Sequence, residues 1–328
     1  MKHKCIILAA LAAFSIVSCN DKEVFEKEQY KNIFGFVSES DNTKKMTVSL
    51  HYETTTTYMS LSMGGTKAPK NDVKINIVLD STLVDEYNKA NYDVDVEKYA
   101  VVMPADKYEI SSMTCVIKSG EVLGTIPVTI HPAGLSPDKD YIIPVRVLSY
   151  DGAELHPDKS SLLLKIAIKN QWSNSSGIGY QMVGNRKLLP DGSPINMPGT
   201  KTIHCWTANS VRMMPGNETF SKDKHTLEAK AMIAYIDAAA DAKGYHKITL
   251  KPYRDIKVTQ LDDDPEYPNV YGIIDDGYNT YKTFLLHYKY QIGNDVYEMR
   301  EETRVLYSED KDVDEGFTII ETKNRRQT

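Results

Sequence analysis

Apolar and polar residues alternate along most of this chain, and this pattern limits the folds it can adopt more than any other feature. Clear examples are Val73-Lys74-Ile75-Asn76-Ile77, Val145-Arg146-Val147 and the run from Leu162 to Ile168. Successive side chains of a β-strand point to opposite faces, so a period of two indicates strands with one buried face. Turn-forming clusters separate these runs at intervals of about eight to twelve residues, which is typical of a β-sandwich. We therefore predict a mainly β protein with a sandwich over residues 33–170.

One segment of this first half departs from the strand pattern. Ser81–Asn91 follows Asp80 and opens with residues that cap helices. It also places Leu83, Val84 and Tyr87 on one helical face. We predict a single short helix there.

A polar stretch from Asn170 to Gly177 interrupts the alternation, and we place a domain boundary between residues 170 and 171. Strand-like runs then return at Ile178–Val183, Lys201–Trp206, Leu227–Tyr235, His246–Leu250, Asn269–Ile274, Thr283–Gln291 and Val296–Tyr307. The last two are joined by Ile292-Gly293-Asn294-Asp295, which predicts a β-hairpin. Only Ile236–Ala242 suggests another turn or two of helix. Long alternating strands favour an antiparallel β-barrel or a curled sheet for residues 171–328.

The first eighteen residues have the order of a secretory signal peptide. Lys2 and Lys4 precede an apolar run from Cys5 to Val17, and the small residue Ser18 stands before Cys19. As a helix this run reaches about 20 Å, which is less than the hydrocarbon core of about 30 Å. We expect residues 1–18 to be a targeting segment that is removed, and residues 19–32 to be a tether.

The segment Ile16-Val17-Ser18-Cys19 resembles the lipobox of bacterial lipoproteins, in which the cysteine is acylated before cleavage. Asn20-Asp21-Lys22-Glu23 is similar to the charged signal that directs Bacteroidetes lipoproteins to the outside of the outer membrane. We therefore predict lipid on Cys19 and attachment to the outer membrane, facing the cell exterior. The alternative is an ordinary signal peptide followed by a chance cysteine.

Net charge, length and cysteine content each limit what the chain can be. The net charge is −6, and no polybasic stripe is present, which argues against nucleic acid as a partner. With 328 residues the chain can form two domains, each with its own core. Cys115 and Cys205 could form one disulfide, but two cysteines so far apart more often lie unpaired in cores.

Four separated segments of the first half carry a resemblance to a known family. They are Asp85-Glu86-Tyr87-Asn88, Met103–Tyr108, Ile117–Glu121 and Leu135–Val145. In this order they resemble the uncharacterised N-terminal domain shared by many Bacteroidetes surface lipoproteins, over residues 33–170. Residues 171–328 are similar to the C-terminal β domain that accompanies it.

The resemblance implies an Ig-like sandwich and a place beside outer-membrane polysaccharide-uptake systems, but no known reaction. Some relatives carry a glycosidase domain after the Ig-like one. Residues 171–328 are too few for a (β/α)₈ barrel of about 250 residues, and they lack its alternation of strand and helix. This departure argues against hydrolysis, and we predict that the protein is not an enzyme.

Motif searches give no specific cofactor or catalytic site. The histidines are scattered and show no pair at the spacing that zinc sites use, although folding could still assemble one. Neither Gly-x-Ser-x-Gly nor a glycine-rich phosphate loop is present. No cofactor is predicted.

Two acidic clusters are the only candidates for a calcium site. They are Asp262-Asp263-Asp264 before Pro265, and Asp275-Asp276 before Gly277. Carboxylates on a turn can surround Ca²⁺, but this spacing matches no calcium loop, and acidic turns are usually solvated. The same residues could form a glycosidase pair only if folding placed two of them about 5 to 9 Å apart in a cleft.

Aromatic residues are the better indication of a ligand, because tyrosine outnumbers phenylalanine 21 to 7. A tyrosine or tryptophan ring can stack on a pyranose, and its polar edge can hydrogen-bond hydroxyl groups. Loops of β scaffolds often carry binding residues, and a segment rich in Pro, Gly, Asn and Asp surrounds one short strand after residue 260. The predicted ligand-binding residues are Trp206, Tyr267, Tyr271, Tyr278 and Tyr281. The alternative is that these rings only cover strand edges and corners.

These observations predict a non-catalytic surface lipoprotein that binds a glycan as an accessory of a polysaccharide-uptake system. The membrane is contacted through lipid on Cys19, and the Ig-like domain serves as a spacer. The alternative is a structural or protein-interaction lipoprotein, adhesive or associated with an outer-membrane transporter, without glycan affinity. A cryptic glycan-active enzyme is a third hypothesis.

Overall fold

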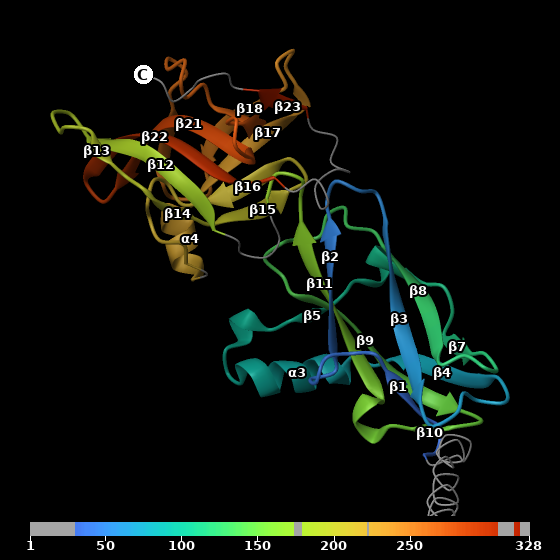
Figure 1. Cartoon of the computed structure of the whole chain (residues 1–328). Helices are drawn as coiled ribbons and strands as arrows, with labels where there is room; N and C mark the ends of the chain where they lie inside the picture. The colour runs from blue at the N-terminus through green and yellow to red at the C-terminus, as the bar shows by residue number, and fades with distance from the viewer. Residues whose placement is uncertain (1–29, 174–178, 222, 308–317, 322–328) are drawn as a thin grey trace, which may run out of the picture. The chain divides into compact units, whose positions relative to one another are not determined.

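The computed structural model describes residues 30–173, 179–221, 223–307 and 318–321, and it consists mainly of β-strands (Figure 1). The predicted mainly β class is confirmed. The Cα positions divide the chain into two compact units. Besides the long C-terminal part from Ile166, the second unit includes Thr47–Thr55 and His131–Asp140. The predicted signal peptide and Cys19 lie outside the described residues.

The first unit consists mostly of two β-sheets, in which a few strand ends belong to the segments assigned to the second unit. One has the strand order β10 (Glu154–Leu155), β1 (Ile33–Phe36), β3 (Thr55–Gly64), β8 (Leu123–Ile130), β6 (Tyr108–Ile110). The other has the order β2 (Thr43–Ser49), β11 (Ser161–Lys169), β9 (Tyr141–Tyr150), β4 (Val73–Leu79), β7 (Thr114–Ile117), and β5 (Val101–Val102) pairs with β9. Val73, Ile75 and Ile77 of β4 are buried and alternate with more exposed residues. Two sheets with buried apolar rows form the predicted β-sandwich.

The predicted helix is confirmed as α3 (Thr82–Tyr92). Asp80 Oδ1 accepts hydrogen bonds from the backbone N and the Oγ1 of Thr82, at 3.1 and 2.7 Å. The apolar face of the helix packs in a small buried cluster that contains Val84, Ala100, Ile142 and Leu163. Three short 3₁₀ turns complete the unit: η1 (Val96–Lys98), η2 (Ala105–Lys107) and η3 (Pro157–Lys159).

The second unit is built on one twelve-stranded sheet. Its main order is β13 (Ile195–Asn196), β12 (Tyr180–Leu188), β22 (Asp295–Leu306), β21 (Thr280–Ile292), β20 (Val270–Asp275), β18 (His246–Pro252), β17 (Met232–Ala240), β16 (Ser210–Met213), β15 (Ile203–Thr207). In addition, β14 (Gly199–Lys201) pairs with β12, β19 (Lys257–Gln260) with β21 and β23 (Ile319–Glu321) with β20. The predicted hairpin is confirmed as β21 and β22, joined at Gly293, which has a φ of 59°.

A short stretch of chain joins the two edges of this sheet. β14 pairs with β12 near one edge, and β15 pairs with β16 at the other edge. Only Thr202 separates β14 from β15. The sheet therefore has to curl until its edges come close together, which is the barrel-like arrangement predicted from the long strands.

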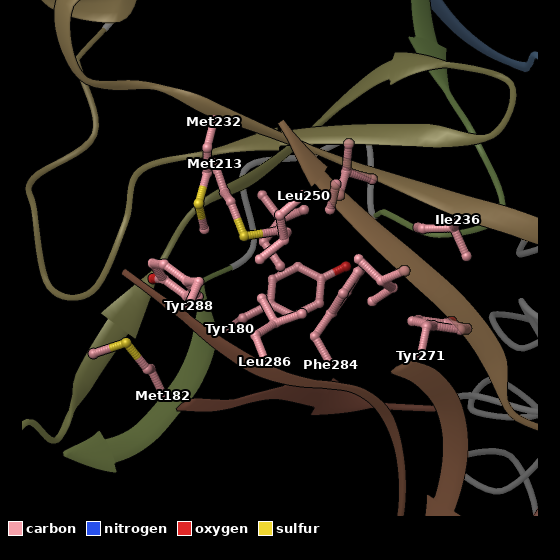
Figure 2. Packing of buried hydrophobic residues seen from close by; sticks show 14 of the residues in the cluster. Tyr180, Met182, Met213, Met232, Ile236, Leu250, Tyr271, Phe284, Leu286 and Tyr288 are labelled. Atoms are coloured by element: carbon pink, nitrogen blue, oxygen red, sulfur yellow. The ribbon is translucent and has the colours of Figure 1, made fainter. Parts of the chain in front are cut away.

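Large side chains fill the inside of the curled sheet (Figure 2). Tyr180, Phe284, Leu286 and Tyr288 are fully buried there, among the methionines and aliphatic residues of the facing strands. Trp172 belongs to the same core, and its Nε1 donates a hydrogen bond to the backbone oxygen of Ala208 at 2.9 Å. This core gives the second unit a rigid scaffold for its loops.

A buried ion pair lies within this interior. Lys201 Nζ is 2.5 Å from Glu301 Oε1, and the two side chains are 3% and 0% exposed. Tyr288 donates a hydrogen bond to the other carboxylate oxygen at 3.1 Å and accepts one from the backbone N of Gly216 at 2.7 Å. Lys201 is on β14 and Glu301 on β22, so the pair connects β14, which leads through Thr202 to the other edge of the sheet, to β22.

Two secondary-structure predictions in this unit are wrong. The segment from Leu227 was predicted as a strand, but Lys224–Lys230 form the helix α4. Its N-cap is Asp223, whose carboxylate accepts hydrogen bonds from the backbone N and Oγ1 of Thr226 at 2.8 and 2.9 Å. The predicted helix over Ile236–Ala242 is instead the end of β17. Its alanines favour a helix in isolation, but pairing with β18 outweighs that preference.

The two cysteines of the described residues behave as predicted. Cys115 lies in the first unit and Cys205 in the second, and both thiols are free and buried. Burial raises the pKa of Cys115 to about 11 and, together with the charge of Asp138, that of Cys205 to about 12. In the described part of the chain, no helix has the length and apolar character needed to span a membrane.

Candidate functional site

Charged side chains line the outward face of β22. Met299, Glu301 and Thr303 point into the core and are fully buried, so the residues between them point outward. The outward residues alternate in charge: Glu298, Arg300, Glu302 and Arg304. Because β22 lies between β12 and β21, this charged row runs along the middle of three paired strands.

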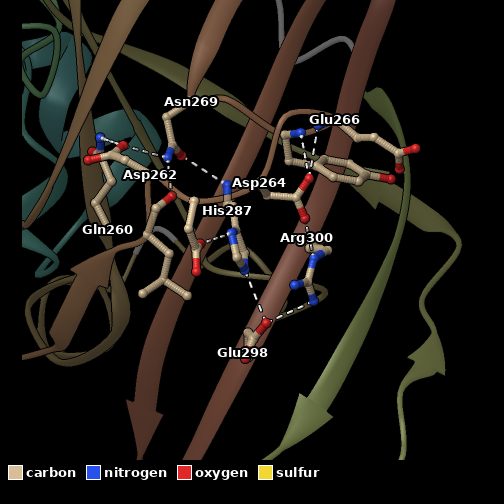
Figure 3. Close-up of polar contacts among 11 residues, drawn as sticks. Gln260, Asp262, Asp264, Glu266, Asn269, His287, Glu298 and Arg300 are labelled. Carbon is tan, nitrogen blue, oxygen red and sulfur yellow. Dashed lines mark hydrogen bonds and ion pairs between the residues drawn. The ribbon is translucent and has the colours of Figure 1, made fainter.

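Arg300 holds the loop that precedes β20. Its Nε lies 2.6 Å from Asp264 Oδ2, and its Nη1 lies 2.8 Å from Glu298 Oε1 (Figure 3). The other carboxylate oxygen of Asp264 accepts backbone hydrogen bonds from Glu266 and Tyr267, at 2.9 and 3.3 Å. Burial raises the pKa of Asp264, but the bond from Arg300 and these backbone donors outweigh it and hold the pKa below its ordinary value. We call Arg300, Asp264 and Glu298 the first clasp.

His287 and Asn269 fix the same loop to the sheet (Figure 3). The imidazole of His287 is buried, with Nε2 3.1 Å from Glu298 Oε1 and Nδ1 3.3 Å from Asp263 Oδ1. Asn269 adopts a left-handed φ of 55°. Its side chain accepts a hydrogen bond from the backbone N of His287 at 2.9 Å and donates one to the backbone oxygen of Leu261 at 2.6 Å. The loop is therefore bound at several points along its length.

Arg304 holds the turn that follows β20. Its Nη1 lies 3.4 Å from Asp276 Oδ2 and 3.5 Å from Glu302 Oε1. The other carboxylate oxygen of Asp276 accepts backbone hydrogen bonds from Tyr278 and Asn279, at 3.1 and 3.0 Å. We call Arg304, Asp276 and Glu302 the second clasp.

The second clasp presents two of the predicted ligand-binding tyrosines. Tyr278 lies at the tip of the turn and is 93% exposed. Tyr281 is partly buried, and the guanidinium of Arg304 lies over its ring, 4.3 Å from the centroid. Gly277 has a φ of 89°, a conformation that glycine adopts without strain and that the tight turn requires. The turn is thus fixed while the ring at its tip faces solvent.

Four of the five aspartates considered as calcium ligands accept hydrogen bonds from protein donors. In the residues that the structure describes, no group of three or more His, Cys, Asp or Glu could hold a metal ion. Asp264 and Asp276 belong to the clasps, and Asp263 faces His287. Asp262 Oδ1 accepts hydrogen bonds from Gln260 and Asn269, and Asp275 Oδ1 accepts one from the backbone N of Gly277. These carboxylates shape the two loops.

Tyr271 does not contribute to this surface. Its ring is fully buried in the core, 5.1 Å from the ring of Trp172 and 5.0 Å from that of Phe284. The prediction that it contacts a ligand is therefore wrong. Tyr271 lies on β20 between Val270 and Gly272, and its ring points into the core cluster of the curled sheet.

Trp206 is separate from the two clasps. It lies on β15 and takes part in neither clasp. Its ring packs 5.2 Å from that of Tyr253, and the guanidinium of Arg212 lies 5.0 Å from each centroid. Arg212 also makes two bonds to Asp138, at 2.6 and 2.9 Å. The structure thus brings Tyr267, Tyr278 and Tyr281 to the clasps but leaves Trp206 in another cluster.

The charged residues that position these tyrosines are not among the predicted site residues. They are His287, Glu298, Arg300, Glu302 and Arg304. The order Glu-x-Arg-x-Glu-x-Arg over residues 298–304 is a signal that could have revealed four of them, because every second residue of a strand shares one face. No local pattern marks His287.

Family models cover both units of the chain. A model described as an N-terminal domain matches residues 25–154, and a model described as a C-terminal domain matches residues 160–304. The chain belongs to this two-domain family. The resemblance found in the four sequence segments is confirmed, and both clasps lie within the C-terminal family domain.

Solved structures of Bacteroides proteins share the fold of this family member. A protein of unknown function from Bacteroides ovatus is 14% identical, with a TM-score of 0.59, over 88% of this chain and 94% of that chain. A multidomain protein including DUF1735 from the same species is also 14% identical, with a TM-score of 0.57, over 84% and 94% of the two chains. An auxiliary nutrient binding protein from Bacteroides thetaiotaomicron is 14% identical, with a TM-score of 0.56, over 82% and 94%. A search of the curated proteins finds no match.

Proposed function

We propose that this family member is a non-catalytic surface lipoprotein that binds a glycan and assists polysaccharide uptake. The observation that carries this proposal is the tyrosine pair at the second clasp, where Tyr278 is 93% exposed on a fixed turn. A tyrosine ring offers an apolar face to the C–H face of a sugar and a hydroxyl to its polar edge. The auxiliary nutrient binding protein of Bacteroides thetaiotaomicron has the same fold, which agrees with a binding role.

The fixed turn favours binding because little order has to be gained when a ligand arrives. Asp276 accepts two backbone hydrogen bonds within the turn and is paired with Arg304 on β22. Tyrosine itself has few rotatable bonds, so its contact area is gained at a low entropic cost. The turn is therefore suited to recognition in its observed conformation.

Two carboxylates beside the tyrosines, Asp264 and Glu298, do not have the pKa shift of a glycosidase general acid. Burial raises the pKa of both carboxylates. For Asp264 the hydrogen bond from Arg300 outweighs burial, and for Glu298 the hydrogen bond with His287, followed by the charge of Arg300, does so. Each pKa therefore lies below its ordinary value. The general acid of a glycosidase needs the opposite shift, since it has to keep its proton near neutral pH.

Affinity electrophoresis tests glycan binding. Detergent-solubilised full-length protein is run in native gels that contain starch, dextran, laminarin, yeast mannan or arabinoxylan. We expect at least one neutral polysaccharide to retard the protein, and Tyr278→Ala and Tyr281→Ala to reduce that retardation. Tyr235→Ala is the matched control, because Tyr235 is 40% exposed on β17 and belongs to neither clasp.

Two results would count against the proposal in different ways. No retardation by any polysaccharide would refute glycan binding and favour the protein-interaction role. Retardation that survives both tyrosine substitutions would keep glycan binding but remove this site.

The lipid anchor is tested separately by metabolic labelling with tritiated palmitate. We expect label in the wild-type protein and in its membrane fraction, and loss of both in Cys19→Ala, because the thiol of Cys19 is the proposed attachment point. Persistent labelling of the Cys19→Ala protein would show that this assignment is wrong.

A further inference from the structure

The two clasps have the same construction. In each, one carboxylate oxygen of an aspartate accepts hydrogen bonds from the backbone N of the second and third residues that follow it. The other oxygen is paired with an arginine of β22, and that arginine is also paired with the glutamate two residues before it. Each fixed loop carries a tyrosine, Tyr267 in the first and Tyr278 in the second.

The two clasps are separated along β22. Arg300 and Arg304 are four residues apart on one face of β22, which corresponds to about 13 Å at about 3.3 Å per residue. Asp264 precedes β20 and Asp276 follows it, so the two loops extend from opposite ends of that strand. A ligand that touches both loops must therefore be longer than a single sugar ring.

The negative charge of the two loops favours an uncharged polysaccharide over a negatively charged one. Residues 261–269 and 275–279 contain six carboxylates and no lysine or arginine: Asp262, Asp263, Asp264, Glu266, Asp275 and Asp276. The two arginines beneath them are each paired with two carboxylates. Lys187 and Lys289 lie opposite Glu298 on the neighbouring strands, so the excess of negative charge is confined to the loops. A sulfated or uronate-rich chain would be repelled at the loops, whereas an uncharged chain would not.

We propose that the two clasped loops form two subsites for one extended neutral polysaccharide, with Tyr267 and Tyr278 contacting different sugars of the same chain. This inference rests on the proposed glycan binding and adds the substrate class and the mode of binding. The second contact becomes intramolecular once the first has formed, so the polymer binds more tightly than a fragment that reaches only one loop.

The test compares ligands and variants in parallel. Dissociation constants are measured by affinity electrophoresis with dextran, laminarin, yeast mannan, dextran sulfate and alginate, and by calorimetry with a size ladder of oligosaccharides from the neutral polysaccharide that binds. We expect Tyr267→Ala and Tyr278→Ala each to weaken polymer binding about tenfold or more, and the double variant to abolish it. Short oligosaccharides should bind weakly and should lose less affinity in the single variants than the polymer does.

Controls separate loss of a contact from loss of folding. Tyr267→Phe and Tyr278→Phe keep the ring and should retain most of the affinity, and Tyr235→Ala should bind like the wild type. Circular dichroism melting checks that each variant is folded.

The possible failures are distinguishable. If no polysaccharide binds, the proposed function itself is refuted. If Tyr278→Ala weakens binding but Tyr267→Ala does not, one subsite exists and the two-loop inference is overturned. Tighter binding of dextran sulfate than of dextran would overturn the assignment to neutral polymers.

Discussion

Arg300 and Arg304 each form ion pairs with two carboxylates. Each arginine joins a loop aspartate to a glutamate of its own strand, so one side chain on β22 fixes the backbone of a loop that comes much earlier in the chain. Bonds between a guanidinium and a carboxylate are stronger than those between neutral groups, and partial burial limits screening by solvent. The loop conformation therefore depends on the ionisation of Asp264 and Asp276.

Asp264 makes this dependence measurable. Its folded pKa lies below the ordinary value of 3.8, so its contribution to stability is present above that pH and is lost as the pH falls through the folded pKa. We expect Asp264→Asn to lower the free energy of unfolding by about 1–2 kcal/mol at neutral pH and to reduce the loss of stability in acid. Urea unfolding over a pH series measures both quantities.

Asp263→Asn is the matched control, because the side chain of Asp263 is 81% exposed and should contribute little. Identical acid dependence in wild type and Asp264→Asn would contradict the assigned role of Asp264.

The buried pair Lys201 and Glu301 gives a second prediction for single residues. Removing one partner leaves an uncompensated charge in the core, so Lys201→Met and Glu301→Gln are each expected to cost about 3–5 kcal/mol. The double variant should cost clearly less than the sum, because it leaves neither charge unpaired. Urea denaturation of the wild type, the two single variants and the double variant gives a double-mutant cycle. Additive losses of stability would show that Lys201 and Glu301 are not coupled.

Among the elements, β12 and β22 approach each other closely at Gly184. A Cβ atom added there would lie 2.1 Å from the backbone oxygen of Arg300 and 2.9 Å from Glu301 Cα. Because these are backbone atoms, Gly184→Ala must displace a strand, and we expect a loss of about 1–3 kcal/mol in the free energy of unfolding. Gly199→Ala is the control, since its Cβ would meet only a methionine methyl group at 3.7 Å.

Chemical denaturation of both glycine variants checks this prediction. Equal stability of Gly184→Ala and wild type would mean that the two strands tolerate separation at this point. A loss limited to Gly184→Ala would support strand proximity as the cause.

Sequence patterns predicted the elements whose conformation is decided locally. The alternation in β4 and the Gly293 turn between β21 and β22 are local signals, and both are present in the structure. The alanines of β17 were misread because hydrogen bonding to the next strand, β18, decides their conformation, and helix propensity alone does not show that pairing. Tertiary pairing overrides local propensity in such cases.

The candidate site was predictable only in part for the same reason. Tyr278 could be placed on a turn from its neighbours Asp276 and Gly277. The partnership of Asp276 with Arg304 depends on the register between β20, β21 and β22, which no local pattern specifies. Tyr271 was misassigned because its inward direction depends on the phase of a short strand.

At the scale of the whole molecule, Cys115 and Cys205 provide one buried thiol in each unit. Burial keeps both pKa values far above neutrality, about 11 and about 12, so neither group is a reactive thiolate at neutral pH. We expect iodoacetamide to modify neither in the native protein. We also expect the two to become reactive at different urea concentrations, since each unit has its own core.

Peptide mass spectrometry after labelling at each urea concentration identifies which thiol has reacted. Labelling of both thiols over one common transition would contradict independent unfolding of the two units.

The connection through Thr202 joins the two edges of the twelve-stranded sheet, and this affects how copies of the protein interact on the cell surface, where we propose that it is displayed. A sheet whose edges are brought together leaves few unpaired backbone groups for a strand of a neighbouring molecule. Copies held at high density in two dimensions can then collide repeatedly without joining edge to edge. The connection that shapes the interior thus also limits edge-to-edge pairing at this sheet.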